Sequence, residues 1–287
     1  MTTIDAHQHL WTVADGNLGD YGWLDAEALS PITRTYTEAD LEPLLAAAGI
    51  DGTVMVQSAN TVADTAAMVA VADRWSRVTG IVGWAPLLDP EETARTIEGW
   101  RSDPRMVGVR HLINDEPDPD WIMQPPVLES LALLSAGGLS YDVIGVLPRH
   151  LEHAAYIAER VPGLRLVLDH LGSPPIRDTG WEPWAGLMRR AADHPNVFVK
   201  VSGLGTCADW VTWQPADMQR YVDWVIECFG VDRLLFGGDW PVSVLAGGYA
   251  RMWAGTQALL QGLTATERAR VLGGTAIDVY RLAVSAP

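Results

Sequence analysis

Short runs rich in Val, Ile and Leu alternate with helical patterns eight times along this chain, and this repetition is the feature that most restricts its fold. Strands are expected at residues 3–5, 53–56, 81–84, 107–111, 140–144, 165–169, 197–201 and 234–236. Helices are expected at residues 38–48, 62–77, 90–101, 127–136, 149–160, 183–193, 216–229, 248–260 and 264–272. Apolar strands joined by helical crossovers form a parallel sheet that is buried on both faces.

Eight such units within 287 residues favour an α/β fold of the (β/α)8 (TIM) barrel type, whose typical length is about 250 residues. A doubly wound sheet is the alternative, but it would carry a Gly-rich turn after an early strand, and GxGxxG does not occur here. Because the sequence has no linker or low-complexity segment, we expect one domain over residues 1–287. The Pro- and Asp-rich stretch 114–124 is expected to be a loop after the fourth strand.

The charge balance excludes several classes of partner. The chain has 20 Lys and Arg against 36 Asp and Glu, a formal charge of −16, and no basic run that could replace the counterions of nucleic acid. The same charge opposes binding to anionic lipid. The N-terminus lacks the pattern of a signal peptide, and Cys207 and Cys228 are too few for a disulfide framework. We therefore expect a cytoplasmic protein with a small-molecule partner, and leave homo-oligomer formation open.

In a barrel of this kind the active site lies at the carboxyl ends of the strands. Six of the eight strands bring polar residues to that end: His7 and His9, Arg110 and His111, Tyr141 and Asp142, Asp169 and His170, Lys200 and Ser202, and Asp239. The sequence therefore predicts that these side chains meet at one rim of the barrel.

The mixture suits hydrolysis of a carbonyl compound, which needs a base for water, positive charge near the developing oxyanion and an acid for the leaving oxygen. Asp239 is the candidate base, with His170 and His111 as the other candidate catalytic residues. Arg110 and Lys200 could hold a carboxylate, a hydroxyl or the oxyanion.

Two further sets of residues have a predicted place. Six of the 13 Trp residues fall in expected loops, where they could wall a pocket for a small ring: Trp11, Trp23, Trp121, Trp210, Trp213 and Trp240. Among these, we expect Trp11 and Trp240 to contact the substrate. The three histidines on or beside helices, His150, His153 and His194, are expected at the surface.

Several motifs resemble those of the amidohydrolase superfamily, namely DAHQHLW, GVRH with DEPD soon after, LDHLGSPP, FVKVSGL and LLFGGDWPV. The resemblance runs from Asp5 to about Tyr280, and is strongest to the amidohydrolase-related branch that contains lactonases for fuconolactone and rhamnonolactone. It implies a (β/α)8 barrel that hydrolyses a cyclic ester.

The resemblance also implies roles for matching positions. His7 and His9 match the histidine pair of strand one, His170 the histidine of strand six, and Asp239 the strand-eight carboxylate that takes a proton from water. The superfamily's two-metal members carry a bridging Lys or Glu on strand four and a His on strand five, and neither is present here. We therefore expect no metal, or at most one zinc-like divalent ion held by some of these four residues.

Two alternatives to a sugar-acid lactonase stay open. The first is another enzyme of the superfamily, a metal-dependent decarboxylase or a hydrolase of aromatic-pathway lactones. Such substrates carry carboxylates and call for more arginine than the single strand-end Arg110. The second is a barrel that binds a sugar or acid without converting it.

Overall fold

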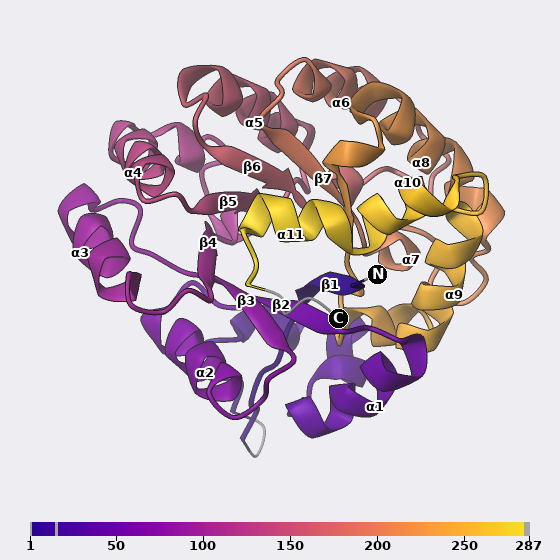
Figure 1. The fold of residues 1–287 in the computed structure, drawn as a ribbon, viewed down its shortest axis with the longest axis horizontal. Helices are drawn as coiled ribbons and strands as arrows, with labels where there is room; N and C mark the ends of the chain where they lie inside the picture. Colours follow the sequence, from indigo (N-terminus) through magenta and orange to yellow (C-terminus); the bar gives the residue numbers. More distant parts are fainter. Residues whose placement is uncertain (1, 15–16, 284–287) are drawn as a thin grey trace.

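The computed structural model describes residues 2–14 and 17–283, and its centre is a barrel of parallel strands in the order β1 to β8 (Figure 1). The strands are β1 (Ile4–Gln8), β2 (Gly52–Val56), β3 (Val78–Gly83), β4 (Met106–Arg110), β5 (Ser140–Val143), β6 (Arg165–Leu168), β7 (Val197–Val201) and β8 (Leu234–Phe236). The expected (β/α)8 barrel is therefore confirmed.

Helices surround the strands. They are α1 (Glu38–Ala48), α2 (Val62–Ala72), α3 (Pro90–Trp100), α4 (Pro125–Ala136), α5 (Pro148–Arg160), α6 (Trp184–Ala192), α7 (Leu204–Cys207), α8 (Pro215–Phe229), α9 (Tyr249–Leu259), α10 (Ala265–Ala269) and α11 (Thr275–Tyr280). Local sequence sets several of their ends. The Asp89 side chain accepts a hydrogen bond from the Glu92 N–H at the start of α3, and left-handed Gly49 ends α1.

Several expected boundaries differ from the structure, among them those of β1, of α2 and of the last expected helix. Strand β1 continues to Gln8, so His7 lies within the strand rather than after it. Helix α2 ends at Ala72, five residues before the expected end. The helix expected at residues 264–272 does not stop before the glycine pair, because a π turn at Arg270–Gly274 carries the chain into α11.

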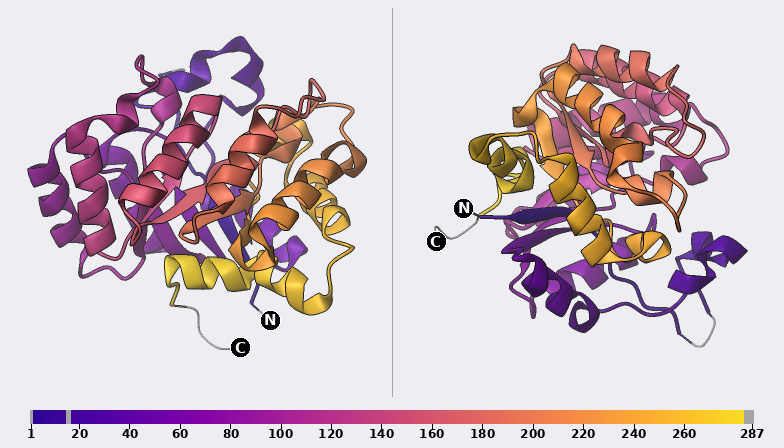
Figure 2. Two further views of the ribbon diagram at one scale, coloured as in Figure 1. Left: turned by 90° about the horizontal axis from the view of Figure 1, so that it is seen from above. Right: turned by 90° about the vertical axis from the view of Figure 1, so that its right-hand side faces the viewer.

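The two ends of the barrel are covered differently. Helix α11 lies across the end where the strands begin (Figure 1), and its Ala276 and Val279 pack against strand residues such as Ile4 and Leu235. The segment after β1 contains two short 3-10 helices, Gly22–Asp25 and Glu27–Ile32, and stands at the opposite end (Figure 2, left). The loop expected at 114–124 is confirmed, with 3-10 turns at Ile113–Asp115 and Trp121–Met123.

The first and last strands meet through residues at the carboxyl end. Gln8 and Trp240 form a parallel bridge. The His9 N–H donates to the Trp240 carbonyl at 2.7 Å, and the Asp239 N–H donates to the His7 carbonyl at 2.8 Å. Two histidines of strand one and the carboxylate after strand eight are thereby placed side by side.

The expectation of surface histidines on α5 is wrong, because His150 and His153 are buried. His150 Nδ1 accepts a hydrogen bond from the Leu147 N–H at the start of the helix, and His153 Nε2 lies 2.9 Å from an Asp120 carboxylate oxygen. His194 is half-buried. Over residues 2–14 and 17–283, none of the helices combines the length and the apolar character that crossing a membrane demands.

Candidate active site

A pocket of about 240 Å³ opens among the segments that follow the strands. Every strand except β3 contributes to it, at its last residue or in the segment that follows. The lining residues are His9, Trp23, Ser58, Arg110, Leu112, Asn114, Asp115, Ile144, His170, Ser173, Thr206, Cys207, Asp239 and Val242. This is the position at which (β/α)8 barrels place their active sites.

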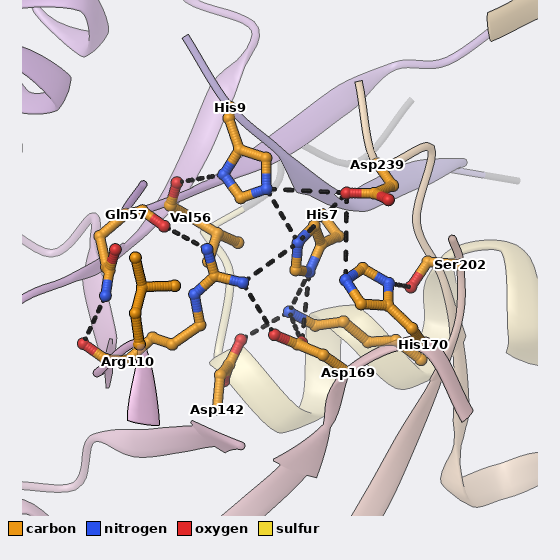
Figure 3. A network of polar contacts seen from close by, with 12 residues as sticks. His7, His9, Val56, Gln57, Arg110, Asp142, Asp169, His170, Ser202 and Asp239 are labelled. Atoms are coloured by element: carbon orange, nitrogen blue, oxygen red, sulfur yellow. Dashed lines mark hydrogen bonds and ion pairs between the residues drawn. The ribbon is translucent and has the colours of Figure 1, made fainter. Parts of the chain in front are cut away.

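Three imidazoles and one carboxylate, here called the outer cluster, lie together at this end of the barrel (Figure 3). Asp239 Oδ1 is 3.7 Å from His7 Nε2, 3.7 Å from His9 Nε2 and 4.0 Å from His170 Nε2. The two Nε2 atoms of His7 and His9 are 3.1 Å apart. The structure thus brings the predicted His-x-His pair, strand-six histidine and strand-eight carboxylate to one point.

Further hydrogen bonds hold the Nδ1 sides of the His9 and His170 rings and the backbone around the outer cluster. His9 Nδ1 lies 2.7 Å from the Val56 carbonyl, and His170 Nδ1 lies 2.8 Å from Ser202 Oγ. The buried Asp5 carboxylate accepts hydrogen bonds from the N–H groups of His7 and Gly238 and from the Tyr249 hydroxyl. Asp5 therefore joins the start of strand one to the turn that carries Asp239.

The backbone itself adopts an uncommon conformation at two of these residues. His170 has φ +54° and Asp239 has φ +50°, both in the left-handed region that most side chains avoid. A Cβ on Gly203 would lie 2.6 Å from His170 Nδ1 and 3.1 Å from Asp239 Oδ2, so only glycine lets this segment approach so closely. Such conformations concentrate at functional sites, where the surrounding packing maintains them.

Beneath the outer cluster lies a set of four paired charges, here called the inner cluster: Arg110, Asp142, Asp169 and Lys200. Lys200 Nζ lies 2.5 Å from Asp142 Oδ2, 2.9 Å from Asp169 Oδ1 and 3.0 Å from His7 Nδ1. Arg110 Nη1 donates to Asp169 Oδ2 at 3.0 Å, and the Tyr280 hydroxyl donates to Asp142 Oδ2 at 2.7 Å. Two cations balance two carboxylates, as buried charges require.

Burial and charge shift the pKa values of both clusters. Burial raises the pKa of Asp239, against the opposing effects of His170 and Arg110. Burial, with help from the Arg110 charge, lowers the pKa of His9 to about 3, and burial and Lys200 hold that of His7 well below its usual range. Burial opposes ionisation of Asp169, but Lys200 and His7 outweigh it and keep its pKa well below the usual range. The outer cluster therefore combines neutral imidazoles with a carboxylate of increased proton affinity, as a general base requires.

The outer cluster has the donor set of a single zinc-like site. A tetrahedral zinc ion with bonds of about 2.0–2.1 Å separates its ligand atoms by about 3.3 Å, close to the spacing among His7 Nε2, His9 Nε2 and Asp239 Oδ1. A second group of donors comprises His7, Asp169 and His170. The Lys200 ammonium already lies within 3.0 Å of His7 Nδ1 and Asp169 Oδ1. Its positive charge balances the negative charge of this second group, where an ion would otherwise bind.

His111 lies beside the pocket rather than in its lining. Its ring stacks on Trp121 with 3.9 Å between centroids, its Nδ1 accepts from Trp84 Nε1 at 3.0 Å, and its Nε2 is 2.7 Å from Glu116 Oε1. Because an indole N–H can only donate, Nδ1 carries a lone pair and the proton lies on Nε2. His111 thus ties the loop after β4, which supplies pocket residues, to the barrel.

The tryptophans divide into packing and lining residues. Trp11 and Trp240, expected to contact the substrate, are buried outside the pocket lining, and both pack edge-on against Tyr36. Trp23 does line the pocket. Lys200, also expected to bind substrate, is 0% exposed and contacts His7 instead.

Sequence reasoning missed two residues that support the site. Asp5 has the same strand parity as His7 and His9, and that signal could have identified it. Tyr280 had no such signal, because the helix that carries it was not expected. The polar pocket residues Ser58, Asn114 and Thr206 were also missed, since loop conformation decides which side chains face the cavity.

Comparison with known proteins agrees with this geometry. The family model described as Amidohydrolase matches residues 4–282. An L-fucono-1,5-lactonase of Burkholderia ambifaria is 39% identical over 97% of this chain and 95% of its own length, and one of Burkholderia multivorans is 33% identical over 97% and 96%. A crystal structure of an amidohydrolase from Burkholderia multivorans with bound zinc has a TM-score of 0.91 and 31% identity, covering 98% of this chain and all of the other. The chain therefore belongs to the amidohydrolase family.

Proposed function

We propose that this protein is a lactonase that opens a sugar-acid lactone of the L-fucono-1,5-lactone type. The observation that carries the proposal is the outer cluster, in which one carboxylate of raised pKa faces three imidazoles at the edge of a pocket. Two curated lactonases that are 39% and 33% identical over nearly the whole chain support the choice of substrate class.

In this mechanism, Asp239 takes a proton from a water molecule as the water oxygen attacks the ester carbonyl carbon. His170 and Arg110, which both line the pocket, stabilise the negative charge that develops on the carbonyl oxygen. The tetrahedral intermediate then breaks the bond between this carbon and the ring oxygen. The proton on Asp239 passes to the ring oxygen, which leaves as a hydroxyl and restores the carboxylate.

We also propose that the outer cluster holds at most one ion, through His7, His9 and Asp239, with His170 nearby. When bound, such an ion would supply Lewis acidity toward the carbonyl. A crystal structure of a 31% identical amidohydrolase contains bound zinc, which supports the binding of an ion by a chain of this fold. Elemental analysis of protein purified without chelator, read beside activity before and after chelation, tests it. A reproducible content near two ions per chain would contradict the assignment.

Hydrolysis produces an acid and releases a proton, so a pH indicator reports turnover directly. Incubation with a panel of neutral sugar lactones should give rates well above spontaneous hydrolysis in buffer. The Asp239→Asn protein is the matched control, because it retains the shape of the site without its base. Rates equal to those in buffer for every lactone would refute the lactonase and favour a barrel that binds without converting.

The runner-up is hydrolysis of a dicarboxylate lactone or decarboxylation of an aromatic acid. Among the pocket-lining residues that the structure describes, Arg110 is the only Lys or Arg, and Asp115 and Asp239 are both acidic. This lining favours a neutral, polyhydroxylated substrate, because a second carboxylate would face like charge without a partner.

A further inference from the structure

The hydrogen bonds around the two histidines of strand one determine where their protons lie. The Val56 carbonyl can only accept, so His9 Nδ1 donates to it at 2.7 Å. With that proton on Nδ1, the neutral ring of His9 carries its lone pair on Nε2. That lone pair faces His7 Nε2 at 3.1 Å, the length of an N–H···N hydrogen bond. His7 Nε2 is then the donor.

The other nitrogen of His7 has two possible partners of opposite character. Lys200 Nζ lies 3.0 Å from Nδ1 and can only donate, whereas Asp169 Oδ1 lies 3.2 Å from the same atom and can only accept. When His7 carries its proton on Nε2, Nδ1 accepts from Lys200. When the proton lies on Nδ1, it is donated to Asp169, and Nε2 is free to bind an ion. These two neighbours therefore stabilise different tautomers.

Arg110 is the remaining group near this ring. Its Nη1 lies 3.4 Å from His7 Nε2 but 3.0 Å from Asp169 Oδ2, and its Nη2 donates to the Gln57 carbonyl. The shorter bonds hold the guanidinium on Asp169 and Gln57, so the Nε2 proton of His7 is not displaced by it.

We propose that Lys200 is a positioning residue that keeps the proton of His7 on Nε2. With this proton in place, His7 Nε2 donates a hydrogen bond and has no lone pair with which to bind an ion. The inner cluster therefore favours hydrogen-bond donation over ion binding in the outer cluster. Lys200 is fully buried and fixed by Asp142 and Asp169, so its third proton has His7 Nδ1 as its partner. The catalytic consequence rests on the proposed lactonase activity, whereas the tautomer and its effect on ion binding do not.

The test compares the wild-type protein with Lys200→Met and with Lys200→Met/Asp142→Asn. The single variant leaves one uncompensated negative charge in the inner cluster. The double variant removes one cation and one carboxylate, so the cluster remains neutral and folding is protected. Any effect shared by both variants arises from loss of the donor to His7 rather than from the summed charge. Tyr280→Phe is the control, because it removes another hydrogen bond to Asp142 but leaves the ammonium in place.

The first measurement is the imidazole tautomer, read from 15N–1H NMR spectra of histidine-labelled protein, with His7 assigned through a His7→Gln variant. We expect the His7 proton on Nε2 in the wild type and in Tyr280→Phe, and on Nδ1 in both Lys200 variants. A proton on Nδ1 in the wild type, or an unchanged tautomer in both Lys200 variants, would overturn the proposal.

The second measurement is the zinc dissociation constant, from titration of chelator-treated protein. Both Lys200 variants should bind zinc at least about 10-fold more tightly than the wild type. Changes in the hydrogen-bond partners of metal-ligating histidines alter metal affinity by about this factor. Equal affinities would contradict the proposed role of Lys200.

The third measurement is turnover of the lactone by chelator-treated protein. Without the Nε2 proton of His7, two imidazole lone pairs would face each other at the contact that flanks Asp239, and this would displace the groups around the proposed base. Both Lys200 variants should therefore lose about 100-fold in kcat with KM changed by less than about threefold. A raised KM with unchanged kcat would instead make Lys200 a substrate-binding group and overturn the positioning role. If the wild type opens no lactone, the proposed function fails, and the tautomer and zinc measurements still decide the role of Lys200.

Discussion

The two ends of the barrel are built from the same eight strands but differ in what those strands present. At the end where the strands begin, Ile4, Val54 and Leu235 lie in one apolar cluster with Ala276 and Val279 of α11. At the end where the strands finish, many of the pocket residues are charged or polar, and three of them, His170, Ser173 and Asp239, have left-handed backbone. The first end can therefore tolerate changes that only cost packing energy, whereas the second depends on the exact placement of single atoms.

The largest expected effect comes from removing the base at the functional end. Asp239→Asn should lower kcat by about 10³-fold or more while the protein remains folded, since an amide has nearly the same shape but cannot accept the proton from water. Steady-state turnover of the lactone, with circular dichroism as a check of folding, measures this. Turnover near the wild-type value in a folded variant would remove Asp239 from its role.

A smaller loss is expected from crowding the same end without touching its charges. Gly203→Ala places a methyl group 2.6 Å from His170 Nδ1, so the ring must shift to relieve the overlap. A shift of about 1 Å in a catalytic group should cost about 100-fold in kcat. Gly49→Ala is the matched control, because Gly49 has φ +69°, close to the +61° of Gly203, but nothing lies within 4 Å of a Cβ there. Equal activity of the two variants would show that the close approach at Gly203 has no role in catalysis.

The charges that line the pocket should also determine whether the enzyme prefers a neutral or a dicarboxylate lactone. We expect kcat/KM for L-fucono-1,5-lactone to exceed that for 2-pyrone-4,6-dicarboxylate by about 10-fold or more, because the pocket offers one arginine beside two acidic residues. Parallel assays with both substrates measure the ratio. A clear preference for the dicarboxylate would favour the runner-up function.

The smallest effect on activity is expected from the packed end. Val279→Ala, in the buried face of α11, should lower the free energy of unfolding by about 2 kcal/mol. Its kcat should stay within about twofold of the wild type, because additive effects are expected at separated sites. Denaturant unfolding and lactone turnover measure the two quantities. A large loss of kcat in the folded variant would mean that the two ends are not independent.

These differences also explain what could be predicted from sequence. The barrel followed from the alternation of apolar runs and helical patterns, and the outer cluster followed from polar residues at strand ends, where parity and position are fixed by the backbone. The role of Trp11 and Trp240 did not follow, because loop geometry turns both rings into the core beside Tyr36. Lys200 was expected to hold the substrate, but it is fully buried beneath the pocket. How deep a strand residue lies along the barrel axis is not fixed by sequence alone.

The junction between β1 and β8 has a consequence for how the protein is made. The hydrogen bonds that join these strands run between His7, His9, Asp239 and Trp240, so the seam between the first and last strands is also the proposed reactive centre. A ribosome delivers His7 before Asp239, because domains emerge from it N-terminal part first. A nascent chain that ends before Asp239 lacks the proposed base, so we expect hydrolytic capacity only when the ring of strands is complete.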